Sequence, residues 1–276
     1  MKKLIMLTIS ILLVSSVGVL TTSSSAIGLT STSISGALKK ESFSFAYTDK
    51  TGKRLLAFGN SNPSQLTQAI SSPGDLSAVK YMKHQTSRKD SNGRQTMWNF
   101  AQDEGDLFHL YRGKLKGNDS IILATKDAFQ GHQFLQYTPL KQGSFSKSVV
   151  SAIEKTKKRK IVKQGLIGKA TAIQIGLVEF ERKSGKPLAS IVMATKDGLI
   201  FEDLPGNNDE QSTWRVDDGG VIEPSMFTIL FVTQSESGYS LGFEWIGVEG
   251  HYLKLIQQQA DKFRTILEGS RYTAPV

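Results

Sequence analysis

Pairs of apolar runs joined by short glycine-containing turns recur along this chain, and they constrain its fold more than any other feature. The pattern is typical of β-hairpins, because glycine readily adopts the positive φ that a tight turn requires. We expect four hairpins, over residues 43–59, 106–127, 177–197 and 228–247. The sequence therefore predicts antiparallel sheets.

Two octamers within these runs are nearly identical. SIILATKD occupies residues 120–127 and SIVMATKD occupies residues 190–197, and six of the eight letters match. We interpret each octamer as the return strand of a hairpin, in which successive side chains point to opposite faces of the sheet. The repeat suggests a duplication, with one unit over residues 43–163 and a second over residues 164–276.

Helical periodicity is expected in three segments, residues 62–74, 145–163 and 252–269. Asn62 is a plausible N-cap of the first, and Gly269 would end the last. Added to the hairpins, these helices predict an α+β fold, in which helices pack on one face of antiparallel sheets and the two units are related.

The N-terminus has the three parts of a secretory signal peptide. Two lysines precede an apolar run over residues 4–20, and small residues follow at Ser24 and Ala26. We expect cleavage after Ala26, which would leave no transmembrane anchor, and a flexible Ser/Thr-rich leader over residues 27–42. The sequence thus predicts a secreted protein, extracellular or associated with the cell wall, and the absence of cysteine suits a Gram-positive bacterium.

The densest charge feature is a basic run over residues 154–163, in a chain whose net charge is +9. Its cations are Lys155, Lys157, Lys158, Arg159, Lys160 and Lys163. They could stabilise the C-terminal end of a helix or lie in a solvated linker. Alternatively, they could bind an anionic cell-wall polymer. The run lacks aromatic residues on which bases could stack, so sequence-specific binding of nucleic acid is not expected.

Motifs for common catalytic chemistry are missing. The sequence has no G-x-S-x-G, no HExxH, no phosphate-binding loop and no cysteine nucleophile. Among the four histidines, His132 is a weak candidate for a general base, whereas packing or a hydrogen bond accounts for His109. Acidic loops and three tryptophans leave open a glycosidase-like carboxylate pair. Trp245 is expected in the core, and Trp214 is expected to be partly exposed.

The loop over residues 201–211 is rich in oxygen ligands. Asp203, Asn207 and Asp209 are weak candidates for calcium ligands, although such loops are usually solvated turns. A zinc site and an organic cofactor have no support in the sequence.

Two functions remain open. The first is a non-enzymatic cell-surface module that associates with anionic wall polymers. The alternative is an extracellular hydrolase that acts on polysaccharide with a carboxylate pair. A pocket that joins two carboxylates, or His132, with a tryptophan would favour the hydrolase, and a flat basic face would favour the module. The sequence establishes neither whether the protein is an enzyme nor what its oligomeric state is.

Overall fold

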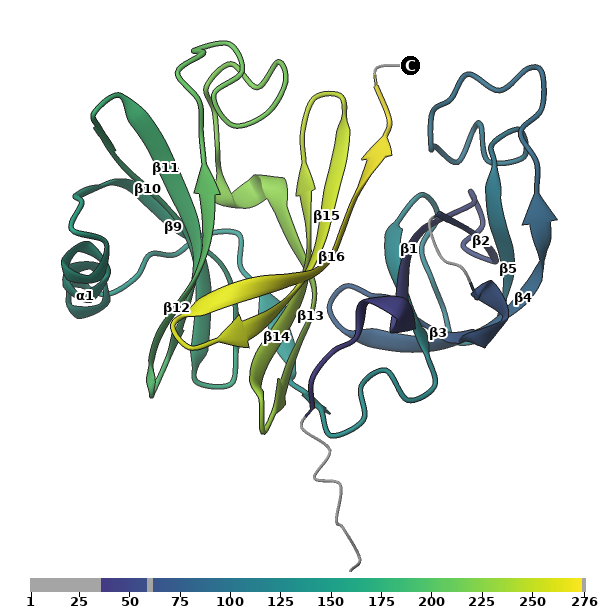
Figure 1. The fold of residues 1–276 in the computed structure, drawn as a ribbon, viewed down its shortest axis with the longest axis horizontal. Coiled ribbons are helices and arrows are strands. Elements are labelled where there is room, and N and C mark those ends of the chain that lie inside the picture. The colour runs from purple at the N-terminus through teal and green to yellow at the C-terminus, as the bar shows by residue number, and fades with distance from the viewer. Residues whose placement is uncertain (1–35, 59–61, 275–276) are drawn as a thin grey trace, which may run out of the picture. The chain divides into compact units, whose positions relative to one another are not determined.

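A computed structural model describes residues 36–58 and 62–274, which belong to one compact unit (Figure 1). The predicted signal peptide and most of the predicted leader lie outside the described residues. Within this part, the chain forms sixteen strands in two sheets, one α-helix and three 3₁₀ helices. The 3₁₀ helices are η1 (Lys40–Ser42), η2 (Pro63–Gln65) and η3 (Pro224–Met226). No helix in the described residues is long and apolar enough to cross a membrane.

The first sheet is a closed barrel in which the strands follow the order β1-β2-β5-β4-β3-β6. Its strands are β1 (Phe43–Thr48), β2 (Arg54–Phe58), β3 (Leu66–Ser71), β4 (Asp75–Gln85), β5 (Gly105–Arg112) and β6 (Ser120–Thr125). β6 closes the barrel by pairing with both β1 and β3. Buried apolar side chains such as Leu55, Phe108 and Leu123 fill the interior. Closure satisfies the backbone groups that an open edge would expose.

The second sheet has ten strands and curls around a core of its own. Its strands are β7 (Gln133–Phe134), β8 (Tyr137–Pro139), β9 (Ile161–Ala170), β10 (Ile173–Lys183), β11 (Lys186–Thr195), β12 (Gly198–Pro205), β13 (Phe227–Ser235), β14 (Gly238–Ile246), β15 (Gly250–Gln259) and β16 (Lys262–Tyr272). Two four-stranded meanders, β9 to β12 and β13 to β16, meet through one parallel bridge between Phe201 and Lys262. The enclosed side chains include Ile175, Ile191 and Phe243.

Two further apolar layers cover the outside of the curled sheet. Helix α1 (Lys147–Lys157) places Ile153 against Phe180 and Phe201, on the outer face of β9 to β12. The barrel covers the other meander, where Phe45 and Ile122 share a buried cluster with residues of β13, β15 and β16. Strands such as β1, β6 and β11 are therefore buried on both faces.

Three of the four predicted hairpins are confirmed. β1 pairs with β2, β10 with β11, and β13 with β14. In the β10–β11 hairpin, Ser184 and Gly185 form a two-residue turn with φ of 51° and 74°, as a type I′ turn requires. The hairpin predicted over residues 106–127 is wrong, because β5 pairs with β2 and β4 and has no pairing with β6.

The predicted α+β fold with helices on one face is also wrong, since the described part is mostly β and has one α-helix. Residues 62–74 form a 3₁₀ turn followed by β3, and residues 252–269 lie in the β15–β16 hairpin. Only the middle prediction holds, and in part: α1 starts after the capping Ser146 but ends at Lys157, six residues before the predicted end.

The octamers lie in sheets of different topology. Residues 120–127 include β6 of the closed barrel, whereas residues 190–197 include the end of β11 in the ten-stranded sheet. β11 is the return strand of a hairpin, as predicted, and β6 is not. The repeated sequence therefore does not mark a repeated structural unit.

Candidate functional site

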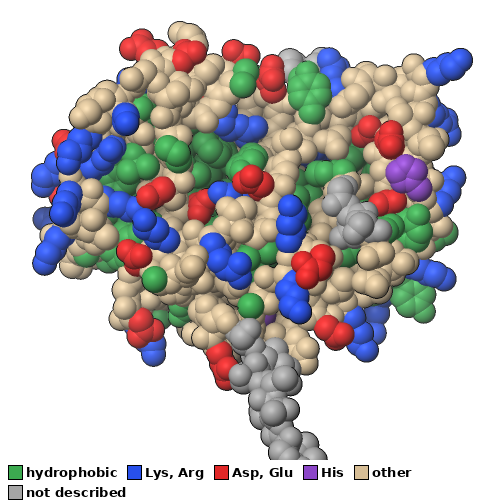
Figure 2. Space-filling view, in the orientation of Figure 1, with side chains coloured by type: hydrophobic (Ala, Val, Ile, Leu, Met, Phe, Trp, Pro, Cys, Tyr) green, Lys and Arg blue, Asp and Glu red, His purple; other side chains and the backbone are tan. Residues whose placement is uncertain are grey.

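The positive charge of the chain is concentrated around α1. Residues 147–186 contain eleven Lys and Arg against three Glu, whereas residues 187–276 contain six Lys and Arg against thirteen Asp and Glu. Figure 2 shows basic side chains gathered at the left edge of the molecule, where Figure 1 places α1 and the β10–β11 hairpin. The fold thus keeps a basic segment next to an acidic remainder of the same sheet.

Three of the six cations in the predicted basic run form ion pairs within the fold. Lys157 lies 2.5 and 2.7 Å from the two carboxylate oxygens of Asp203, and its ammonium group is 4.2 Å from the centre of the Phe201 ring. Lys160 pairs with Glu154 at 2.9 Å, and Lys163 pairs with Glu223 at 2.8 Å. The side chain of Lys157 is only 11% exposed, so it serves the packing of α1.

The three cations without an ion pair, together with Lys160, surround a shallow pocket at the C-terminal end of α1. Its volume is about 350 Å³, and Lys155, Lys158, Arg159 and Lys160 line it together with Glu154 and Glu181. Both carboxylates are engaged, because each accepts a hydrogen bond from a backbone N–H of residue 160 or 161. We call these four cations and their pocket the basic groove. Four cations against two carboxylates leave an excess of two positive charges around this pocket.

His132 lies away from this groove and connects two segments. Its Nε2 is 2.6 Å from the carbonyl oxygen of Gly36, which can only accept, so Nε2 donates. Its Nδ1 then accepts from the hydroxyl of Thr233, at 3.1 Å. Burial lowers the pKa of His132, and the Gly36 carbonyl opposes that shift. With both nitrogens engaged, His132 holds residue 36 against β13.

The three calcium candidates do not converge. Asp203 lies in β12, where it accepts from Lys157 and from the hydroxyl of Ser190 at 2.6 Å. Asn207 and Asp209 lie in the following loop, and each accepts a backbone N–H two residues further on. In the ranges that the structure describes, no three His, Asp or Glu side chains gather as metal ligands would.

The tryptophans have different surroundings. Trp245 is buried in the curled sheet, as predicted, and Trp214 packs at the edge of the same core. Trp98 is the most exposed of the three, at 62%, and lies beneath the ammonium group of Lys50. None of them lines the pocket whose wall includes Asp197, Glu236, Asp261 and Tyr239.

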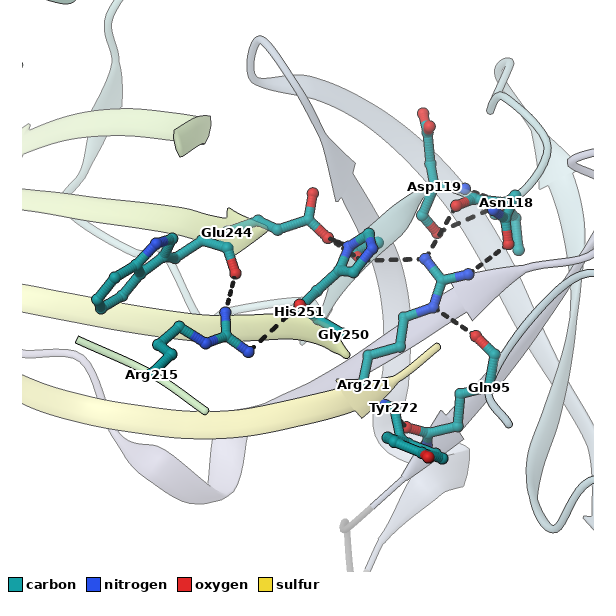
Figure 3. A network of polar contacts seen from close by, with 12 residues as sticks. Gln95, Asn118, Asp119, Arg215, Glu244, Gly250, His251, Arg271 and Tyr272 are labelled. Atoms are coloured by element: carbon teal, nitrogen blue, oxygen red, sulfur yellow. Dashed lines mark hydrogen bonds and ion pairs between the residues drawn. The ribbon is translucent and has the colours of Figure 1, made fainter. Parts of the chain in front are cut away.

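A buried polar network that the sequence analysis missed lies between the barrel and the curled sheet (Figure 3). Arg271 of β16 is fully buried. It donates to the carbonyl oxygens of Gln95 and Asn118, at 2.7 and 2.9 Å, and to the side chain of Asn118. It also donates to the hydroxyl of Ser120, at 3.2 Å. Because its acceptors belong to the barrel side, Arg271 connects the two sheets.

Glu244 is the carboxylate of this network. The hydroxyl of Ser120 and Nδ1 of His251 both donate to its Oε1. Burial acts to raise the pKa of Glu244, but these two hydrogen bonds and the charge of Arg271 outweigh burial and hold the pKa below its ordinary value. Glu244 is therefore an ionised group that balances a buried arginine.

The network contains serine, glutamate and histidine but does not have the geometry of a hydrolase triad. In a triad, histidine contacts the serine hydroxyl and a carboxylate orients the histidine. Here Ser120 contacts Glu244, and no hydrogen bond links it to His251 within the described residues. Since the carboxylate lies between them, His251 is not placed to remove the serine proton, and the arrangement is suited to holding the two sheets together.

No sequence motif marks Arg271, whose role depends on partners more than 150 residues away in the chain. The basic run was visible in the sequence, but its division into paired and unpaired cations was not. Comparison of this chain with family models, with curated proteins and with solved structures finds no match.

Proposed function

We propose that this protein is a secreted, non-enzymatic module that binds an anionic polymer of the bacterial cell wall through the basic groove. The observation that carries the proposal is the convergence of four cations, Lys155, Lys158, Arg159 and Lys160, on one pocket. Residues 147–186, which include these four cations, have an excess of eight positive charges, and the net charge of the whole chain is +9.

The form of the groove suits a polymer better than a small molecule. Small-molecule sites enclose most of their ligand and are lined mainly by apolar groups. This groove is shallow, and its lining residues are charged apart from Ser151. Successive phosphates of a chain could occupy it one after another. Such binding gains from the release of counterions and weakens as salt is added.

Secretion is part of the proposal and depends on the sequence alone. The signal-peptide pattern of residues 1–26 supports export, and a Gram-positive wall would supply the polymer. In a Gram-positive host, we expect the exported protein to begin at or near Ile27. Intact-mass measurement of protein from the medium and the wall fraction checks this expectation. Membrane-bound protein that retains residues 1–20 would contradict it.

The groove is tested by replacing Lys155, Lys158 and Arg159 together with glutamine. Lys157 is left in place because it packs on Phe201. A matched control replaces Lys80, Lys83 and Arg112, three exposed cations on β4 and β5 of the barrel, in the same way. Both triple variants lower the net charge by the same amount, so a difference between them reports the position of the charge.

We expect the groove variant to lose retention on walls that bear teichoic acid, and the control to keep it. The wild type should release steadily as salt rises, and the groove variant should show a shallower salt dependence. Stability should change by less than about 1 kcal/mol, since exposed charges contribute little to folding. Equal retention of the groove variant and wild type at low salt would refute the proposal. Equal losses in the two variants would show that only net charge matters.

One observation favours the hydrolase as a second candidate. The turns that join β11–β12, β13–β14 and β15–β16 surround a pocket of about 430 Å³, lined by Asp197, Glu236 and Asp261 with Tyr239 and two glutamines. Two carboxylates across a pocket are what glycoside hydrolysis requires. Release of reducing ends from wall polysaccharide, abolished by Glu236→Gln or Asp261→Asn, would favour the enzyme over the binding module.

A further inference from the structure

A different pocket lies where the loop before β13, the β14–β15 turn and the end of β16 meet. Its volume is about 310 Å³. Val216, Val248 and Tyr272 lie on its wall and are 62%, 63% and 47% exposed. They are three of the ten large hydrophobic side chains in the described residues that are markedly exposed, and they come from three separate segments. An apolar rim around a pocket is typical of a binding site.

Two arginines line this pocket: Arg271, whose guanidinium is engaged in the buried network described above, and Arg215. The guanidinium of Arg215 donates to the carbonyl oxygens of Trp245, at 2.6 Å, and Gly250, at 3.2 Å, and lies over the Trp245 ring (Figure 3). These two bonds use two of its five N–H donors. No carboxylate of a described residue lies within ion-pair distance of it.

Asp218, the carboxylate whose charge acts on Arg215, is committed elsewhere. The carboxylate of Asp218 accepts the backbone N–H groups of Trp214, Arg215 and Gly220. Burial lowers the pKa of Arg215, and the field of Asp218 only partly opposes this shift. A half-buried arginine without a directly paired anion costs free energy, which an anionic ligand would recover.

We propose that this pocket binds a carboxylate carried on a small apolar body. Arg215 holds the carboxylate, and Val216, Val248 and Tyr272 cover the apolar part. The planar guanidinium matches a carboxylate through two parallel N–H donors. The volume admits one small side chain with its acid group, so either a branched free acid or the C-terminal residue of a peptide fits this chemistry. This inference is independent of the basic groove.

Four probes test the proposal by NMR titration of the full chain. 3-Methylbutanoate represents a free acid and N-acetylvaline a peptide C-terminus, and 3-methylbutanamide and N-acetylvalinamide are their neutral counterparts. Both acids, or one of them, should bind saturably and shift the Arg215 Nε–H resonance. The amides should bind at least about tenfold more weakly, because they lose a charge-assisted hydrogen bond. The acid that binds more tightly shows whether the natural ligand is a free acid or a peptide C-terminus.

Four variants place the binding at this pocket. Arg215→Gln and Val248→Ser should each weaken binding, the first by about tenfold or more. Glu249→Gln should strengthen it, because Glu249 also lines the pocket and repels an anion. The control Lys262→Gln removes an exposed charge at the opposite end of β16 and should leave affinity unchanged. Arg215→Gln could disturb the loop that carries it. If that variant unfolds, the affinities of Val248→Ser and Glu249→Gln test the location of the binding site.

The proposal is overturned if neither acid binds saturably, or if the amides bind as tightly as the acids. It is also overturned if Val248→Ser and Glu249→Gln both bind like the wild type, since the ligand would then lie elsewhere.

Discussion

Strands β6 and β11 carry almost the same sequence, yet they belong to sheets of different topology. In β6, Ile121 faces the barrel interior and Ile122 faces the curled sheet. In β11, Ile191 faces the curled interior and Val192 faces the layer under α1. The expected alternation between two faces is therefore confirmed in both. A continuous apolar run meets one local demand, burial on both faces, and leaves the choice of neighbouring strands open.

The serine that begins each octamer donates a hydrogen bond to a carboxylate in both sheets. Ser120 donates to Glu244 of the other sheet, 124 positions away in sequence, and Ser190 donates to Asp203 of the neighbouring strand, 13 positions away. Each carboxylate is accompanied by a cation, Arg271 or Lys157. The two networks differ in burial: Glu244 is buried, whereas the side chain of Asp203 is 38% exposed.

The largest expected difference concerns the two carboxylates. Glu244→Gln should lower the free energy of unfolding by about 3–5 kcal/mol, because it removes the carboxylate whose charge acts most strongly on buried Arg271 and which also pairs with His251. Asp203→Asn should cost less, about 1–2 kcal/mol, since the Asp203 side chain is 38% exposed and Lys157 keeps its contact with the Phe201 ring. Urea denaturation at neutral pH measures both, and Asp90→Asn, an exposed carboxylate, is the control. Equal losses would mean that burial does not distinguish the two networks.

The next contrast concerns the serines. Ser120→Ala should cost about 1.5–3 kcal/mol, because it removes a donor from Glu244 and an acceptor from Arg271, both buried. Ser190→Ala should cost about 1 kcal/mol, since Lys157 still contacts Asp203. The same denaturation experiment checks this order. A larger loss in the free energy of unfolding for Ser190→Ala than for Ser120→Ala would contradict the order expected from burial.

The smallest effect is a dependence on pH. The pKa of Glu244 lies below its ordinary value of 4.5 in the folded state, so its ionised form stabilises the fold above that value. This stabilisation is lost as pH falls through the lower, folded pKa. The difference in stability between wild type and Glu244→Gln should therefore narrow below pH 4.5, with no narrowing between pH 5 and 7. A difference independent of pH would exclude ionised Glu244 as the stabilising form.

Hairpins could be predicted where a turn carries its own signal. Ser184 and Gly185 form such a turn, and the sequence placed it correctly. The β15–β16 turn contains Ala260, which takes a φ of 58° although it is not glycine. Without glycine or asparagine to mark the turn, the segment has no local sign of a hairpin.

The wrong helices have a common physical cause. In β3, the extra residue Thr67 forms a bulge, so Leu66 and Ala69 lie three apart and both face the barrel interior. In β16, a register shift brings the adjacent Ile266 and Leu267 onto one apolar cluster. Apolar residues on one face of a regular strand lie two apart in sequence. A bulge makes them lie three apart or adjacent, and both spacings also occur on the apolar face of an amphipathic helix.

In the basic run, too, one feature could be predicted from the sequence and another depends on tertiary packing. Its position at the end of a helix followed from capping and periodicity, which act over a few residues. That Lys157 pairs with Asp203, whereas Lys155 and Lys158 line a groove, depends on how α1 packs on the outer face of β9 to β12.

By itself, the sequence determined the features that depend on near neighbours: three hairpins, the N-terminal end of α1 and the two-sided burial of β6 and β11. Only the tertiary structure decided that β6 closes a barrel, that Arg271 and Glu244 balance each other between two sheets, and that Arg215 lies among apolar side chains. The reason is physical: strand pairing and ion pairing are chosen by the free energy of burying whole surfaces, to which distant segments contribute together.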